Sequence, residues 1–421
     1  MTNPWSRLRG LPREAWLLSA AILINRAGTM VLPFLVLYLT RSLSLSPRRA
    51  ALVMAAYGIG AVLTAPLAGR LADRVGPRRI VTVSLFLSGL LLLAYPLLRS
   101  FASILWMTLL WSVASEGLRP ASLAWMSDLV PPEKRRAAFA LSRLAVNLGM
   151  SLGPAAAGFI VQVSFTAIFV LDAATSLVAG ALLMLATGKS LAGAARAASV
   201  EEAEAGSPTE ARRAAATPSG ENAVPDRPAS LDPRYLFFIL AILPVEIVFF
   251  QHNSMLPLFL VRELGLRESS YGLLFTINTL LVTLVEVPLV AALSDWSYRT
   301  TLSLGALLIG AGFGALFLAQ GFGSVAAMVV VWTFGEMIFV PGSAAYAAEA
   351  APPGRRGEYI GLYSMSFSGA FALAPWLGAQ VMEGFGPREM WVAALLAGLL
   401  SAALLLNLRE RPRGPRDAAP M

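Results

Sequence analysis

The chain has 421 residues, of which 57% are hydrophobic and 14% are charged, and its mean hydropathy is +0.66. This composition is more apolar than that of soluble globular proteins and predicts an integral membrane protein. The chain has no cysteine and only one histidine, His252, which excludes disulfides, thiolate metal sites and cysteine nucleophiles. The net charge of +8 does not indicate nucleic-acid binding, because the Lys and Arg residues lie at the ends of apolar segments without interleaved aromatic residues.

Twelve apolar segments are long enough to cross a bilayer, since a spanning helix needs about 20 apolar residues. No small-residue cleavage site follows a short apolar core near the N-terminus, so we expect the first segment to be retained as a span and not removed as a signal peptide. The twelve segments lie near 15–39, 50–69, 80–98, 102–128, 137–163, 165–187, 235–261, 270–293, 301–320, 324–348, 358–382 and 389–407.

A polar stretch divides these spans into two sets of six. Residues 189–233 are rich in Ala, Glu, Arg, Ser and Pro and show no apolar periodicity, which is typical of a solvated linker. We therefore predict an all-α integral membrane protein with an N-terminal six-helix bundle at 1–188, a linker at 189–233 and a C-terminal six-helix bundle at 234–421.

The distribution of positive charge predicts the orientation of the spans. Most of the 33 Lys and Arg residues lie on the side that carries both termini and the linker, and Arg41, Arg48 and Arg49 are a local exception on the other side. Because cytoplasmic loops carry an excess of Lys and Arg, we expect a multi-pass protein of the plasma (inner) membrane with both termini in the cytoplasm.

The two halves repeat each other. At one constant offset Pro120 matches Pro341, Ser122 matches Ser343, Arg135 matches Arg356 and Pro154 matches Pro375. A slip of one residue then matches Asp73 with Asp295. Parallel repeats related by an axis along the membrane normal are typical of transporters that rock one half against the other.

The most charged short segment between two spans runs from Gly69 to Arg79 and reads Gly-Arg-Leu-Ala-Asp-Arg-Val-Gly-Pro-Arg-Arg. Its glycines allow close helix approach and a sharp turn, and its aspartate can accept hydrogen bonds from a facing helix N-terminus. We predict that it is a gating motif, which latches the two halves on the cytoplasmic side and must release for opening. Its residues are Gly69, Asp73, Arg74, Gly76, Arg78 and Arg79. The alternative is that these charges only orient the loop.

These features resemble the major facilitator superfamily over essentially the whole chain. The segment from Gly69 to Arg79 fits the family pattern Gly-x-Leu-Ala-Asp-Arg-x-Gly-x-Arg-Arg without a gap. The fifth span is similar to the motif of the proton-driven exporters, and Gly335-Glu336 is similar to an acidic position of multidrug exporters. The resemblance implies the family's fold of twelve helices in two pseudo-symmetric bundles, and a relation to the 12-span drug:proton antiporters.

The fifth span carries small residues and a proline at close spacing. Gly149, Gly153 and Gly158 leave a smooth face, and Pro154 removes one backbone hydrogen bond. We predict a bending hinge at these four residues. Ordinary close packing of small residues is the alternative.

Five ionisable residues lie far from either surface, on the spans that line the central cavity in the resembled family. They are Arg26, Glu116, Arg119, Glu246 and Glu336. Charged groups facing lipid are costly, so we expect these side chains to face a shared wet cavity and to bind protons or substrate there. An apolar surrounding disfavours the charged form of a carboxylate, which can then exchange a proton near neutral pH. Structural pairing of Arg26 with Glu116 or Glu336 is the alternative.

The sequence therefore predicts a secondary active transporter that exports amphipathic or lipophilic small molecules, driven by the proton gradient without a cofactor. A carrier for a defined metabolite such as a sugar, peptide or lipid is the alternative on the same fold. An intramembrane enzyme is a remote third possibility, because no nucleophile with a base and no paired-carboxylate motif is present. We expect a monomer whose partners are the substrate, protons and membrane lipids, with no nucleic acid.

Overall fold

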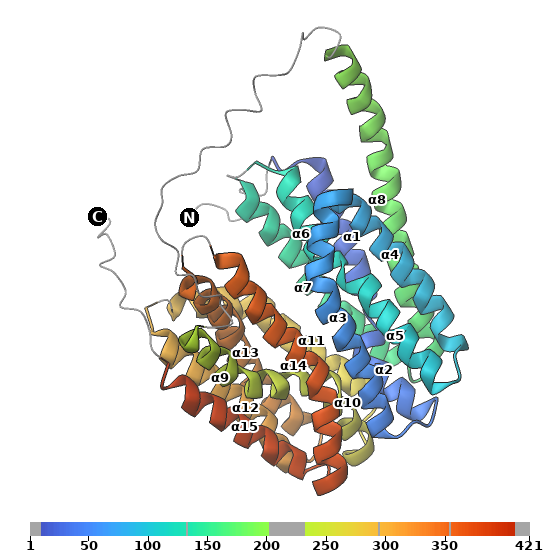
Figure 1. Ribbon diagram of the computed structural model, residues 1–421. Helices are drawn as coiled ribbons and strands as arrows, with labels where there is room; N and C mark the ends of the chain where they lie inside the picture. Colours follow the sequence, from blue (N-terminus) through green and yellow to red (C-terminus); the bar gives the residue numbers. More distant parts are fainter. Residues whose placement is uncertain (1–9, 132–133, 202–231, 294, 353–354, 409–421) are drawn as a thin grey trace.

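The computed structural model describes residues 10–131, 134–201, 232–293, 295–352 and 355–408, while the side chains at 65–70, 72–73, 136, 186–201 and 356 lie outside this description. Over these residues the chain forms helices and no strand, which confirms the all-α prediction. Figure 1 shows the helices in chain order.

The described residues of the first half form the following helices. They are α1 (Arg13–Ala27), α2 (Val31–Arg41), α3 (Pro47–Val75), α4 (Pro77–Ala94), η2 (Tyr95–Leu97), α5 (Phe101–Glu116), α6 (Leu118–Leu129), α7 (Arg135–Ile160) and α8 (Phe165–Glu201). Helix α8 continues to Glu201, into the stretch expected to be linker.

The second half contains seven α-helices and three short turns. They are α9 (Pro233–Phe249), η5 (Phe250–Asn253), α10 (Met255–Leu258), η6 (Phe259–Glu263), α11 (Glu268–Ala292), α12 (Tyr298–Gly314), η7 (Ala315–Leu318), α13 (Phe322–Ala350), α14 (Arg356–Phe385) and α15 (Glu389–Leu405).

Each of the twelve expected spans is helical, but three of them are interrupted. The first consists of α1 and α2, the fourth of α5 and α6, and the seventh of α9, η5 and α10. Among the described residues, nine helical segments are long and apolar enough to cross a membrane by themselves, and α15 is a shorter apolar helix. The chain is therefore a multi-pass membrane protein.

Local sequence sets where several helices begin. Ser100, Asp232 and Ser297 accept hydrogen bonds from backbone N–H groups in the first turns of α5, α9 and α12. Between α3 and α4 a single residue makes the turn: Gly76 has φ of 93°, which favours glycine, and Pro77 begins α4.

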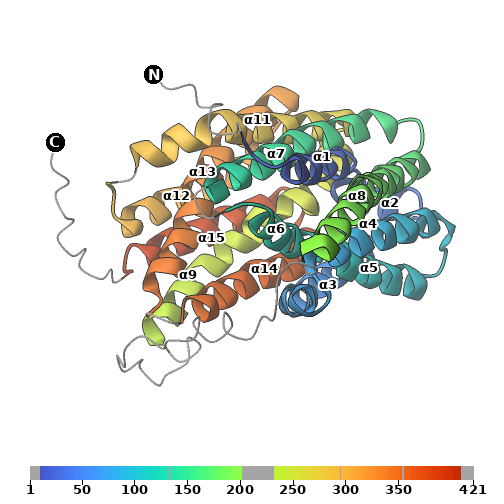
Figure 2. The same ribbon diagram turned by 90° about the horizontal axis from the view of Figure 1, so that it is seen from above.

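The two halves lie side by side and meet along two pairs of helices. Helix α3 packs against α14 and α7 packs against α11 (Figure 2). We call the end of the molecule where α8 ends and α9 begins the linker end, and the opposite end, where α2 contacts α10, the far end (Figure 1).

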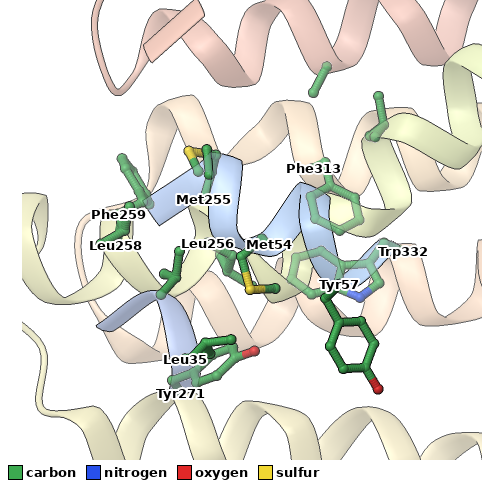
Figure 3. Packing of buried hydrophobic residues seen from close by; sticks show 14 of the residues in the cluster. Leu35, Met54, Tyr57, Met255, Leu256, Leu258, Phe259, Tyr271, Phe313 and Trp332 are labelled. Carbon is green, nitrogen blue, oxygen red and sulfur yellow. The ribbon is translucent and has the colours of Figure 1, made fainter. Parts of the chain in front are cut away.

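Apolar packing closes the contact between the halves towards the far end. Figure 3 shows part of one buried cluster to which both halves contribute, including Leu35, Met54 and Tyr57 of the first half and Leu256 and Tyr271 of the second. The rings of Phe34 and Tyr271 meet edge to face with centroids 5.2 Å apart.

Polar contacts reinforce the same closure. Arg41 at the end of α2 forms an ion pair with Glu268 at the start of α11, and the backbone N–H of Arg48 donates to Glu383 Oε1 at 3.1 Å. The structure is thus sealed at the far end.

Candidate functional site

A cavity of about 210 Å³ lies where α7 of the first half faces the second half. Its apolar wall is aromatic and comprises Phe249, Tyr271, Phe275 and Trp332. Its polar lining comprises Asn147, His252, Asn278, Thr279 and Glu336. Small-molecule sites are generally apolar clefts with a few placed polar groups, and this cavity has that character.

Glu336 is the one carboxylate in the lining of this cavity. Its Oε2 accepts a hydrogen bond from the Asn278 side-chain amide at 2.7 Å, and the same nitrogen donates to the Thr333 hydroxyl oxygen at 2.9 Å. Thr333 in turn donates to the backbone oxygen of Val329 at 2.6 Å. These hydrogen bonds therefore hold the carboxylate through Oε2, and no hydrogen bond joins its Oε1 to a described residue.

Glu246 is held elsewhere and does not belong to the lining of this cavity. It lies on α9 and is only 1% exposed, and its Oε2 accepts a hydrogen bond from Ser366 on α14 at 2.7 Å. Its other oxygen is buried without a partner among the described residues. A buried acceptor without a donor is costly, so Glu246 lies in an unfavourable setting for a charged carboxylate.

Glu116 ends α5 and contacts a third set of residues. Its Oε1 accepts a hydrogen bond from the Tyr57 hydroxyl of α3 at 2.8 Å. The ring of Tyr57 packs against Phe371 of the second half, with centroids 5.8 Å apart. The structure thus gives each of the three predicted carboxylates its own hydrogen-bond partner and does not bring them into contact with one another.

The two predicted arginines also lie apart. Arg26 is half-buried in the last turn of α1, within electrostatic range of Tyr57 and Asp172, and its Nε is buried without a partner among the described residues. Arg119 is exposed on α6, within electrostatic range of Tyr363 on α14. In the described residues neither arginine forms an ion pair with Glu116 or Glu336.

The predicted hinge residues lie where α7 approaches other helices closely. A Cβ on Gly149 would stand 2.5 Å from Arg26 Cβ, and one on Gly153 would stand 3.0 Å from the Ala27 backbone oxygen. A Cβ on Gly158 would stand 2.8 Å from Ser269 Cα in the second half. Pro154 lies inside a continuous α7. The small residues therefore allow close packing, and bending stays a prediction.

The gating motif is described only in part. Arg74 is exposed in the last turn of α3, and Arg78 and Arg79 lie in the first turn of α4. The side chains of Arg70 and Asp73 lie outside the described residues, so the predicted latch stays a prediction.

An ion pair between the halves was not predicted from the sequence. Arg143 of α7 pairs with Glu286 of α11, towards the linker end. The Arg143 side chain is 60% exposed and that of Glu286 is 9% exposed. No short sequence motif links these positions, because the pairing depends on how α7 lies against α11.

Comparison with known proteins places this site in a family. The family model of the Major Facilitator Superfamily matches residues 17–266 and 237–420. The MFS-type transporter YqjV of Bacillus subtilis is 26% identical over 91% of this chain and 90% of its own length. A Na(+), Li(+), K(+)/H(+) antiporter of Planococcus maritimus is 24% identical over 84% of this chain and 85% of its own length. Multidrug resistance protein 2 of Bacillus subtilis is 22% identical over 56% of this chain and 55% of its own length.

A solved structure agrees at the level of the fold. A POT family transporter crystallised with 5-aminolevulinic acid superposes with a TM-score of 0.75, over 94% of this chain and 96% of that chain, at 15% identity. The chain accordingly belongs to the Major Facilitator Superfamily and is a transporter of that family with its two-bundle fold.

Proposed function

We propose that this transporter is a proton-coupled exporter of amphipathic or lipophilic small molecules, with the linker end in the cytoplasm. The observation that carries the proposal is the position of Glu336, a carboxylate with one free oxygen in an aromatic cavity between the halves. A proton and a cationic or donor-bearing substrate would compete for that oxygen, and competition for one negative site produces exchange.

The relatives support exchange and export without defining the substrate. Multidrug resistance protein 2 and the Na(+), Li(+), K(+)/H(+) antiporter match this chain at low identity, and their names refer to drug resistance and proton antiport. The positive charge near the linker end supports its cytoplasmic location.

Rocking of the halves would provide alternating access. The far end is sealed by the apolar cluster around Tyr271, and the ion pair between Arg143 and Glu286 crosses the interface nearer the linker end. Export requires the far-end contacts to break while contacts at the linker end form.

The size and polarity of the cavity favour a second candidate, a carrier for one defined metabolite. The cavity measures about 210 Å³ and includes two amides, Asn147 and Asn278, which are suited to recognising a specific small ligand. A promiscuous exporter needs a larger adaptable pocket.

Flux measurements in reconstituted vesicles with an imposed pH gradient test the proposal. We expect the wild type to move lipophilic amines against their gradient, and Glu336→Gln to lose the gradient-driven part while keeping downhill exchange, because a neutral amide cannot carry the proton. The matched control is Glu263→Gln, since Glu263 is exposed and lies outside the cavity. Movement of one sugar or peptide alone would favour the second candidate, and unchanged coupling in Glu336→Gln would contradict the assignment of Glu336.

A further inference from the structure

Most hydrogen-bond donors in the cavity lining are already engaged with the protein, whereas several acceptors of the lining residues have no partner among the described residues. Asn278 illustrates this. Its nitrogen donates to Thr333 and to Glu336, and a carboxylate can only accept, so the amide is oriented with its nitrogen towards α13. The Asn278 Oδ1 makes no hydrogen bond to a described residue. It is also not fully buried, so it remains accessible from the cavity that Asn278 lines.

His252 offers a second acceptor. Its Nδ1 lies 2.6 Å from the backbone oxygen of Phe249, and because a carbonyl only accepts, Nδ1 carries the hydrogen. In the neutral ring Nε2 then has a free lone pair. The His252 Nε2 makes no hydrogen bond to a described residue. It is not fully buried, so it is also accessible from the cavity that His252 lines.

Glu336 offers the third acceptor and the charge. Only Oε2 of Glu336 accepts a hydrogen bond from Asn278, so Oε1 likewise has no partner among the described residues and is not fully buried. The Tyr271 hydroxyl hydrogen is not available to a ligand, because it is donated to the backbone oxygen of His252 at 2.9 Å. Asn147 and the Trp332 indole are the remaining side-chain donors of the lining, and no Lys or Arg is among the lining residues of this cavity.

The volume and the aromatic wall indicate what can accompany a donor-bearing group. An apolar cavity of about 150 Å³ holds benzene. The 210 Å³ here therefore admits one aromatic ring with a short polar arm, against the faces and edges of Phe249, Phe275 and Trp332.

We propose that the cavity selects small, single-ring protonated amines, whose N–H groups bind Glu336 Oε1, Asn278 Oδ1 and His252 Nε2, and that it discriminates against quaternary ammonium ions of equal charge. A quaternary ion satisfies the charge of Glu336 but brings no donor, so the acceptors lose their hydrogen bonds. Sites built around hydrogen bonds to a substrate N–H reject analogues that lack it. The inference rests on the proposed transport of small molecules and specifies their chemistry.

Three matched ligands test the inference on the wild-type protein. They are 2-phenylethylamine, which is protonated near neutral pH, its N,N,N-trimethyl analogue with the same charge and no donor, and 2-phenylethanol with a donor and no charge. Competition against radiolabelled 2-phenylethylamine in equilibrium dialysis measures affinity. We expect both analogues to bind at least about tenfold more weakly than the primary amine.

A variant locates the effect. His252→Phe keeps a ring and removes the Nε2 acceptor, so it should weaken the primary amine and leave the trimethyl analogue unchanged. The matched control Gln162→Leu removes a polar side chain that bonds to Gly158 outside the cavity, and should change neither ligand.

The outcomes separate this inference from the proposed function. Equal affinity for the primary and quaternary amines, or for the alcohol and the amine, overturns the inference whether or not the protein transports them. If no lipophilic amine moves under a pH gradient, the proposed function is contradicted, and the dialysis measurement still decides whether the cavity prefers protonated amines.

Discussion

At the scale of single residues, the buried carboxylate of Asp172 has a structural role, because it binds backbone groups of another helix. It lies on α8 and is 5% exposed, and its Oδ2 accepts hydrogen bonds from the backbone N–H groups of Met30 and Val31, each at 3.1 Å. These groups begin α2, where the first span is interrupted. A buried N–H without an acceptor is costly, so one side chain of α8 stabilises the break in another span.

Replacing Asp172 should therefore reveal a structural role. We expect Asp172→Ala to lower the free energy of unfolding by roughly 1–2 kcal/mol, because two N–H groups lose their acceptor. Asp172→Asn keeps a carbonyl oxygen in place and should cost less. Thermal denaturation in detergent measures the difference, and equal melting temperatures for the wild type and both variants would contradict the capping role.

At the scale of helices, the halves approach closely at glycines. A Cβ on Gly58 of α3 would stand 2.4 Å from Ala372 Cα of α14, and one on Gly272 of α11 would stand 2.4 Å from the backbone oxygen of Pro154 in α7. Association of helices in a bilayer depends on such packing, because lipid tails are as apolar as the side chains. The two pairs of contacting helices are thus defined by the smallest residues.

A matched pair of glycine substitutions tests this. Gly58→Ala should push α3 away from α14 and destabilise the protein by roughly 1–3 kcal/mol, as overpacking does. Gly369 of α14 has nothing within 4 Å of its added Cβ, so Gly369→Ala should be neutral or slightly stabilising. Melting temperatures of the two variants in detergent provide the measurement. A loss at Gly369 as large as that at Gly58 would show that helix propensity, and not packing, sets the effect.

At the scale of the whole molecule, two ion pairs among the described residues bridge the halves, one towards each end of the molecule. Arg41–Glu268 lies at the far end and Arg143–Glu286 towards the linker end. A rocking motion that opens one end must separate the pair at that end. In both pairs the arginine is much more exposed than the carboxylate, so losing Arg143 leaves Glu286 unpaired at 9% exposure, whereas losing Glu286 leaves Arg143 largely in solvent.

Charge reversal should show whether Arg143–Glu286 controls opening at the linker end. The chain has no cysteine, so Met150→Cys places a single reporter in the cavity lining. Glu286→Arg should raise its maleimide labelling rate from the linker end roughly fivefold or more, a typical coupling between conformational states.

The double variant Arg143→Glu with Glu286→Arg provides the decisive comparison for this ion pair. It should return the labelling rate towards that of the Met150→Cys parent, because the opposite charges again face each other. Charge reversal at the exposed Glu263 is the control. A double variant that labels as fast as Glu286→Arg alone would show that the pair does not hold the halves.

Much of the architecture follows from local sequence. Apolar segments of spanning length between charged turns predict the helices, and Gly76 followed by Pro77 predicts the tight turn between α3 and α4, because only glycine adopts φ of 93° readily. The interruptions at 28–30 and at Gly117 were not predicted. A helix break inside a span is stabilised by groups distant in sequence, such as Asp172, and leaves little local signal.

The site was predictable only as a set of residue types. Ionisable residues deep in apolar segments identified Glu336, Glu246 and Glu116 from the sequence alone, because lipid excludes charge. Which of them faces a cavity depends on the crossing of α7, α11 and α13, and only the tertiary structure brings Asn278 to Glu336 and His252.

The sequence by itself determined that this protein lies in a membrane, where its helices are and that its two halves repeat. Hydrophobicity and turn residues act over short distances along the chain. The tertiary structure alone decided that Glu336 lines the cavity, whereas Glu246 and Glu116 accept hydrogen bonds from Ser366 and Tyr57. It also decided which arginine bridges the halves. These pairings depend on contacts between helices far apart in the chain, and such contacts are fixed by packing geometry across the bilayer and not by any local pattern.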